Sequence, residues 1–194
     1  MKLILGSSSK YRKNILKKAG YVFDILVPDI DEKLIEINDP YQRPLVVARA
    51  KAEILIPQIK EPALLITSDV IAVCNGKVRE KPNTKEEARE FLREYSKGIV
   101  PEGVTAIVIY NTVTKKYYEA IDIARVFFDE FSEAVIEDFI ENGDVLGRAG
   151  GFGVQSPILR PYVKEIKGDE ESIVGMPVAL LKKLLKQAGY QIGF

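Results

Sequence analysis

Short apolar segments alternate with helical patterns along the first third of the chain. Lys2–Leu5 predicts a short buried strand, and Ala63–Val73 is the strongest strand pattern in the sequence. Between them, residues at positions 11, 15 and 19 form the apolar face of a predicted helix that Gly20 ends, and residues 45–59 predict a long second helix. This order of strands and helices predicts an α/β protein.

The rest of the chain adds a hairpin-rich part to this pattern. Asn75-Gly76 directly follows the strongest strand and predicts a tight turn that returns the chain beside it. The other elements predicted from periodicity and end signals are strands at 21–27, 104–110, 117–128 and 158–166 and helices at 84–95, 132–143 and 177–188. Pro161 interrupts the last of these strands, which favours an edge strand or a bulge. No linker is long enough to separate independent domains, so we expect a single domain over residues 1–194.

The composition is that of a globular protein and limits the classes of partner. The 194 residues are 46% hydrophobic and 29% charged, which excludes a disordered or low-complexity chain. Lys and Arg number 28, as do Asp and Glu, so the formal net charge is zero. We therefore expect no nucleic-acid partner and no binding to an anionic membrane through charge. No run approaches the ~18 apolar residues of a membrane span, and we expect a soluble, cytoplasmic protein.

Two residue types limit the available chemistry. The chain has no histidine, which excludes Ser-His-Asp triads and His-ligated metal sites. Its single cysteine, Cys74, cannot form an internal disulfide, which agrees with a reducing cytosol and excludes a Cys-rich zinc site. Acid–base chemistry therefore falls to Asp, Glu, Lys, Tyr or the lone cysteine. Any metal site would be rich in oxygen ligands, which favours Mg²⁺ or Mn²⁺.

A serine-rich loop joins the first predicted strand to the first predicted helix. Ser7 and Ser9 offer hydroxyl donors at the helix start, where unpaired N–H groups attract anions. Arg12 follows within the first turn and could bind a phosphate bidentately. The segment lacks the spacing of a Walker A loop. Both a phosphate-binding loop and a plain serine-capped helix with a basic face are compatible with this pattern.

Asp69 interrupts the most apolar strand of the chain, after Ser68. A carboxylate is costly to bury unless it is paired with a cation or coordinates a metal. One interpretation is that Asp69 projects into a cleft, holds a metal and positions water. The other is that it ends or bulges the strand and accepts hydrogen bonds from the backbone. We favour the functional interpretation.

Other charged residues could complete such a site. Glu32 offers an acidic ligand for a divalent ion, and Lys51 and Lys81 offer cations for a polyphosphate. Lys81 follows the Asn75-Gly76 turn, which would return it beside Asp69. Each of these charges taken alone is most often a solvated surface group.

The segment Gly147–Gly153 is glycine-rich, which permits a close approach of backbone to a ligand. Arg148 could contact a phosphate, and Gln155 just beyond it could read the edge of a base. A flexible connector would have the same composition, so this segment alone does not define a site.

Taken in order, these motifs resemble the Maf family of nucleoside triphosphate pyrophosphatases over essentially the whole chain. The motifs that carry the resemblance are Leu5-Gly6-Ser7-Ser8-Ser9 with Arg12, Asp31-Glu32, Lys51-Ala52, Ser68-Asp69, Glu80-Lys81-Pro82, Ala149-Gly150-Gly151-Phe152-Gly153-Val154-Gln155, Gly168 and Val174-Gly175-Met176-Pro177.

The resemblance implies an enzyme that hydrolyses a nucleoside triphosphate to the monophosphate and pyrophosphate, uses Mg²⁺ or Mn²⁺ and forms a homodimer. It implies an elongated mixed β-sheet flanked by helices, in two lobes around a central cleft. By position, Asp69 is similar to the family's proton acceptor, and Gln155 to a residue linked to base choice. The family's other polar cleft positions correspond to Ser7, Arg12, Glu32, Lys51 and Lys81.

Some positions depart from the family pattern. Tyr11 stands where the family usually has an arginine tied to specificity, Val70 where it has threonine, and Arg148 where it has lysine. The preferred base is therefore left open. The alternative from another functional class is a nucleotide-binding regulator, for example of cell division, that does not cut its ligand. An RNA-binding module is disfavoured by the zero net charge and the lack of an aromatic RNP-like segment.

Overall fold

The computed structural model describes residues 1–32, 35 and 37–191. All seven strands belong to one mixed sheet in the order β2-β1-β3-β5-β6-β7, with β4 paired to β3. The chain divides into two compact units. Unit 1 comprises Met1–Asp69, Thr105–Asp122 and Val174–Phe194, and unit 2 comprises Val70–Val104 and Ile123–Ile173. The expected mixed α/β fold, with a sheet flanked by helices, is confirmed.

Unit 1 contains the parallel strands. Its elements, some of which continue into unit 2, are β1 (Lys2–Leu5), α1 (Lys10–Lys18), β2 (Asp24–Ile25), α2 (Arg43–Leu55), the 3-10 helix η2 (Ile56–Gln58), β3 (Ala63–Cys74), β5 (Glu102–Asn111), β6 (Lys116–Phe128) and α6 (Val178–Gln187). Strand β1 pairs in parallel with β2 on one side and with β3 on the other.

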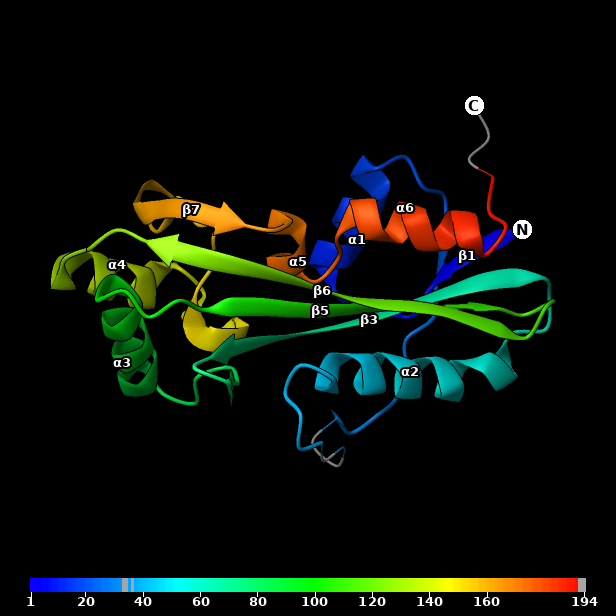
Figure 1. Ribbon diagram of the computed structural model, residues 1–194, viewed down its shortest axis with the longest axis horizontal. Coiled ribbons are helices and arrows are strands. Elements are labelled where there is room, and N and C mark those ends of the chain that lie inside the picture. Colours follow the sequence, from blue (N-terminus) through cyan, green and yellow to red (C-terminus); the bar gives the residue numbers. More distant parts are fainter. Residues whose placement is uncertain (33–34, 36, 192–194) are drawn as a thin grey trace. The chain divides into compact units, whose positions relative to one another are not determined.

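The two faces of the sheet in unit 1 carry separate apolar cores. Side chains alternate along a strand, so Leu64 and Ile66 of β3 pack with α1 and α6, whereas Ala63 and Leu65 pack with α2. Figure 1 shows α2 on one face of these strands and α1 and α6 on the other. The chain therefore leaves β1 over one face and enters β3 from the other, so the strand order reverses between β1 and β3.

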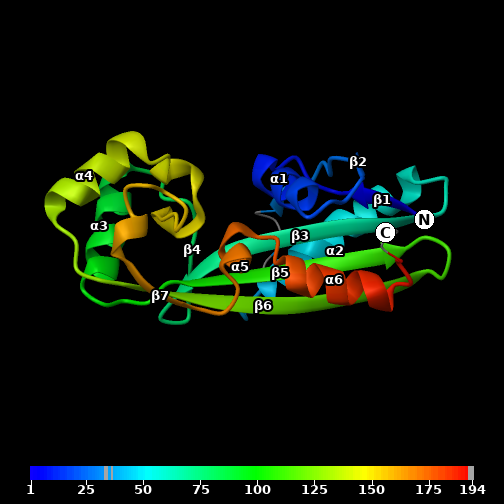
Figure 2. The same ribbon diagram turned by 90° about the horizontal axis from the view of Figure 1, so that it is seen from above.

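Unit 2 is built around two helices and a hairpin. Its elements are β4 (Lys77–Arg79), α3 (Lys85–Ser96), α4 (Glu133–Asn142), the 3-10 helices η3 (Val145–Gly147), η4 (Ala149–Gly151) and η5 (Arg160–Tyr162), β7 (Val163–Lys167) and α5 (Glu170–Val174). Helices α3 and α4 lie side by side (Figure 2). The core between them is aromatic, with Tyr95, Phe128 and Phe152 in ring contact.

Several predicted elements agree with the structure and two are shorter. Asn75 and Gly76 have φ values of 50° and 72°, which a tight hairpin turn requires, and β4 pairs antiparallel with β3. The strand predicted at 21–27 is only Asp24–Ile25. The strand predicted at 158–166 begins at Val163, because Pro161 lies in a 3-10 helix and has no N–H for a ladder. In the part of the chain that the structure describes, no helix has the length and hydropathy needed to span a membrane.

Candidate active site

The serine loop lies at the carboxyl end of β1. Gly6 donates its N–H to the Ile66 carbonyl of β3 at 2.7 Å. A Cβ on Gly6 would lie 2.6 Å from Thr67 Cγ2 and 2.7 Å from Leu55 Cδ1, so only glycine lets the loop approach β3 this closely. In open α/β sheets, ligands bind beyond the carboxyl ends of the strands where the strand order reverses. The loop occupies that place between β1 and β3.

Ser7 and Ser9 order the first turn of α1. Ser9 is the N-cap, and its hydroxyl accepts from the Arg12 N–H at 3.4 Å. The buried Ser7 hydroxyl accepts from the Ser9 N–H at 3.2 Å. Ser9 therefore caps the helix, and its contact with a phosphate stays a prediction. Tyr11, on the same turn, is half exposed.

Arg12 is buried, although it carries a charge. Its Nε donates to the Gly175 carbonyl at 3.2 Å and its Nη1 donates to the Ser7 hydroxyl at 3.4 Å. Burial lowers the pKa of the Arg12 guanidinium, and the charges of Asp69 and Glu32 oppose that shift. Two of the five guanidinium N–H groups thus fix the orientation of the plane from the protein side.

Asp69 is also buried, and a lysine pairs with it. Lys51 of α2 donates from Nζ to Asp69 Oδ1 at 2.9 Å and lies 2.7 Å from Glu32 Oε1. Lys51 and Asp69 are each less than a tenth exposed, whereas Glu32 reaches solvent. The sequence left open whether Asp69 accepts only from the backbone. The structure gives Asp69 a side-chain partner, because Lys51 contacts both Asp69 and Glu32.

The electrostatics of Asp69 suit a base. Burial raises the pKa of its carboxyl above the ordinary value, and the Lys51 and Arg12 charges lower it in part. A carboxylate of raised pKa is a better acceptor for a proton from water than an ordinary one. The positively charged Lys51 and Arg12 side chains can form charge-assisted hydrogen bonds with a phosphate.

Asp69 and Glu32 are the two carboxylates that the sequence analysis predicts as metal ligands. Among the described residues, no three His, Cys, Asp or Glu side chains cluster to hold an ion. Mg²⁺ is commonly bound by one or two carboxylates together with substrate phosphates and water, rather than by an all-protein cage. Asp69 and Glu32 fit that pattern, because they already share one positive charge, that of Lys51.

Three predicted residues belong to unit 2. Lys81 follows β4 and is exposed. The Arg148 Nε donates to the Gly143 carbonyl at 3.2 Å, and its guanidinium lies against Gly153, where a Cβ would be 2.5 Å from Nη1. Gln155 is exposed on the turn after Gly153. Their roles toward a substrate remain predictions.

The sequence analysis missed two groups. Ser68 Oγ donates to the Gly175 carbonyl at 2.8 Å, the same oxygen that Arg12 contacts. The sequence analysis names Ser68 and Gly175 within motifs but predicts no contact for either of them. A buried hydroxyl beside a buried carboxylate was the available signal.

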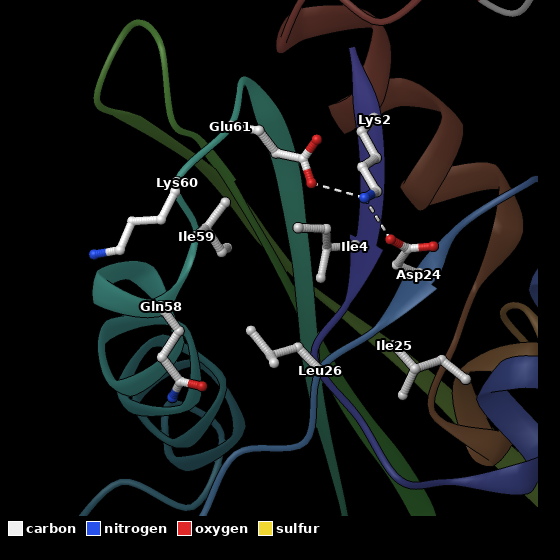
Figure 3. Close-up of a pocket in the computed structure, with 9 residues that line it drawn as sticks. All are labelled: Lys2, Ile4, Asp24, Ile25, Leu26, Gln58, Ile59, Lys60 and Glu61. Atoms are coloured by element: carbon white, nitrogen blue, oxygen red, sulfur yellow. Dashed lines mark hydrogen bonds and ion pairs between the residues drawn. The ribbon is translucent and has the colours of Figure 1, made fainter.

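A separate hollow of about 380 Å³ lies near the amino ends of β1 and β3 (Figure 3). Charged side chains that line it form ion pairs with one another. Lys2 Nζ lies 2.6 Å from Asp24 Oδ2 and 2.7 Å from Glu61 Oε1. Hydrogen bonds from Lys2 to both carboxylates raise the pKa of its ammonium. None of the predicted site residues lines this hollow.

Unit 1 thus has, at its strand ends, a polar cluster of one buried carboxylate (Asp69), two buried cations (Lys51 and Arg12) and a serine-capped helix. The sequence model described as "Maf-like protein" matches residues 2–188. The chain therefore belongs to the Maf-like protein family.

Proteins with similar sequences are named as pyrophosphatases. The chain is 40% identical over 193 residues to a 7-methyl-GTP pyrophosphatase of Dictyostelium discoideum, covering 95% of this chain and 96% of that protein. It is 36% identical to a dTTP/UTP pyrophosphatase of Alkaliphilus metalliredigens, covering 95% and 94%. A solved nucleoside-triphosphatase, named a dITP/XTP pyrophosphatase, of Mycobacterium abscessus matches with 10% identity and a TM-score of 0.40, covering 68% of this chain and 76% of that one.

Proposed function

We propose that this chain is a nucleoside triphosphate pyrophosphatase, which hydrolyses a ribo- or deoxynucleoside triphosphate to the monophosphate and pyrophosphate. The names of two relatives that align along nearly its whole length support this class of reaction. The observation that carries the proposal is the buried Asp69–Lys51 ion pair, 2.9 Å from Oδ1 to Nζ.

Asp69 is the general base of the proposed reaction. Its carboxylate accepts a proton from water as the water oxygen attacks the α-phosphorus. The bond from the α-phosphorus to the bridging oxygen breaks, and pyrophosphate leaves with the electron pair. Burial raises the pKa of Asp69, which makes it a stronger base, while Lys51 keeps it ionised.

The cations around Asp69 stabilise the charge that develops on the phosphates. Arg12 is held by Ser7 and Gly175, so its guanidinium needs little reordering when a triphosphate binds. Before substrate binds, the Lys51 ammonium contacts Asp69 and Glu32. Lys81 is proposed to add positive charge beside the pyrophosphate part of the substrate. Mg²⁺ or Mn²⁺, held by Asp69 and Glu32 together with phosphate oxygens, would neutralise phosphate charge when bound.

The base is the least determined part of the substrate. Tyr11 presents a half-exposed ring beside Arg12, and such a ring can stack on a base. We propose Tyr11, Arg148 and Gln155 as residues that affect nucleotide choice. The names of the relatives make 7-methyl-GTP, dTTP and UTP the first three candidates.

The test is a panel of canonical and modified nucleoside triphosphates with Mg²⁺ or Mn²⁺. Monophosphate and pyrophosphate should appear in equal amounts, and chelation should stop their formation. Release of inorganic phosphate without pyrophosphate would refute the reaction. Tight nucleotide binding with no product from any member of the panel would favour the non-catalytic regulator.

Two expectations about the state of the protein remain proposals. Exposed apolar side chains Val22, Ile25 and Val27 lie along the edge strand β2 and its flanks, which supports a homodimer. Sedimentation equilibrium would test it. The buried free thiol of Cys74 supports a reducing, cytoplasmic location, which localisation of the full chain would test.

A further inference from the structure

We infer that Ser68 is a positioning residue, which acts through the Gly175 carbonyl to fix the Arg12 guanidinium. The inference rests on the proposed function in one respect, namely that Arg12 binds a triphosphate. The bonds themselves lie within unit 1: Ser68 Oγ to Gly175 O at 2.8 Å and Arg12 Nε to the same oxygen at 3.2 Å.

The alternation of β3 explains why Ser68 and Asp69 serve different partners. Thr67 and Asp69 face α2, where Thr67 Oγ1 donates to the Ala48 carbonyl at 2.7 Å and Asp69 pairs with Lys51. Ser68 faces the opposite side, toward the segment between α5 and α6. The two adjacent hydroxyls thus anchor different segments around Asp69.

Gly175 is suited to hold two donors at once. Its φ of +89° lies in the left-handed region that a side chain rarely adopts, so the direction of its carbonyl depends on glycine and on its partners. A carbonyl oxygen has two lone pairs and can accept both bonds. Ser68 is fully buried and Arg12 nearly so, which keeps water from competing.

Loss of the Ser68 hydroxyl should therefore weaken ligand binding through Arg12. If Ser68 and Arg12 act in one network, removing the Ser68 hydroxyl changes how much Arg12 contributes to the binding free energy. The effects of the two substitutions on binding are then not additive. A merely structural hydroxyl would lower stability without such coupling.

The test is a double-mutant cycle with Ser68→Ala and Arg12→Lys, which retains the positive charge. Affinity is measured by calorimetry with the α,β-methylene analogues of 7-methyl-GTP and UTP. We expect Ser68→Ala to weaken binding about fivefold or more with Arg12 present, and less than about twofold with Arg12→Lys, a coupling within the range of contacting residues. Equal effects in both backgrounds would overturn the inference.

Thr67→Val is the matched control. It removes a buried hydroxyl bonded to a main-chain carbonyl, one residue away on the same strand, but on the α2 face. Its effect on binding, whatever its size, should be the same with Arg12 and with Arg12→Lys. Coupling as large as that of Ser68 would show a general loosening of β3 and contradict the positioning role.

Hydrogen exchange of the Arg12 Nε–H separates this inference from the proposed function. If the wild-type protein binds neither analogue and hydrolyses no triphosphate of the panel, the proposed function fails. The inference then stands if Nε–H exchange is slow in the wild type and faster in Ser68→Ala, and fails if the variant leaves it unchanged. If Ser68→Ala does not fold, wild-type exchange as fast as in free arginine overturns the inference, and slow exchange supports it.

Discussion

The two units use charge in opposite ways. In unit 1, the charged side chains of Asp69, Lys51 and Arg12 are buried in one polar cluster. In unit 2, three cations of α3 form a ladder with three glutamates of α4, all at the surface. The pairs are Lys85–Glu141, Arg89–Glu137 and Arg93–Glu133, at 2.6, 2.5 and 2.8 Å.

The physical chemistry of burial explains the difference. An exposed ion pair loses little hydration and gains little, so the ladder contributes small increments and fixes the register of two antiparallel helices. A buried ion pair pays a desolvation cost that its attraction often fails to recover. Apolar side chains in place of the polar cluster of unit 1 would stabilise the fold as well or better, so its charges point to function rather than to stability.

The largest expected effect comes from neutralising the buried carboxylate. Asp69→Asn should lower turnover about 10²–10⁴-fold, the range for loss of a general base. The raised pKa of Asp69 means that its ionised form is disfavoured in the folded state. The variant should therefore unfold at nearly the same temperature or higher, because Lys51 keeps Glu32 as a partner.

The ladder supplies the control for this variant. Glu137→Gln removes one carboxylate charge from unit 2 and should leave turnover unchanged. Both variants are compared by pyrophosphate release and by thermal unfolding. Near-normal turnover of Asp69→Asn would remove Asp69 from the role of base, and the comparison between the units would then lose its functional half.

A smaller effect is expected on the pH dependence when the buried cation is removed. Lys51 lowers the pKa of Asp69 and so opposes the rise that burial causes. In Lys51→Met the pKa should rise further, and the acid limb of kcat/KM should move to higher pH. Where turnover is too low, ¹³C NMR of the Asp69 carboxyl reports the same titration.

Lys85→Met serves as the matched control, because it removes a lysine from an exposed pair in unit 2. Its acid limb should coincide with that of the wild type. An acid limb that moves to lower pH in Lys51→Met, or does not move, would show that Lys51 does not govern the ionisation of Asp69.

The sequence predicted most of this arrangement, but not its internal contacts. Apolar periodicity located β1, β3 and the helices, because burial of one face produces a regular pattern. Asp69 was recognisable because a carboxylate in an apolar strand needs a partner. The pairing of Lys51 with both Asp69 and Glu32 could not be predicted, since it depends on which face of α2 meets β3.

Other misses have local causes. Strand β2 is shorter than its apolar pattern over 21–27, because pairing with β1 covers only Asp24–Ile25. Ser68 and Arg12 both donate to the Gly175 carbonyl, from positions 107 and 163 residues away in the sequence. Contacts of that separation leave no periodic signal in one sequence.

The smallest expected effect is on the stability that one rung of the ladder contributes. Arg89 donates to Glu137 and lowers the pKa of that carboxyl. A group whose pKa is lower in the folded state stabilises it above the unfolded value of about 4.3, and this contribution is lost as pH falls through the folded value. Glu137→Gln should therefore melt slightly below the wild type at pH 7 and together with it at pH 3. The wild type and Glu137→Gln should also melt together in 1 M salt, which screens the ion pair, and should differ in low salt.

Phe139→Ala, in the same helix, defines the opposite behaviour. Phe139 is fully buried, and its loss should cost about 3–5 kcal/mol through lost burial and a cavity. That deficit contains no titrating group, so it should persist at pH 3 and in 1 M salt. If the deficit of Glu137→Gln also persisted under both conditions, Glu137 would act through packing, and the ladder of unit 2 would not be the screened surface charge that distinguishes it from the buried polar cluster of unit 1.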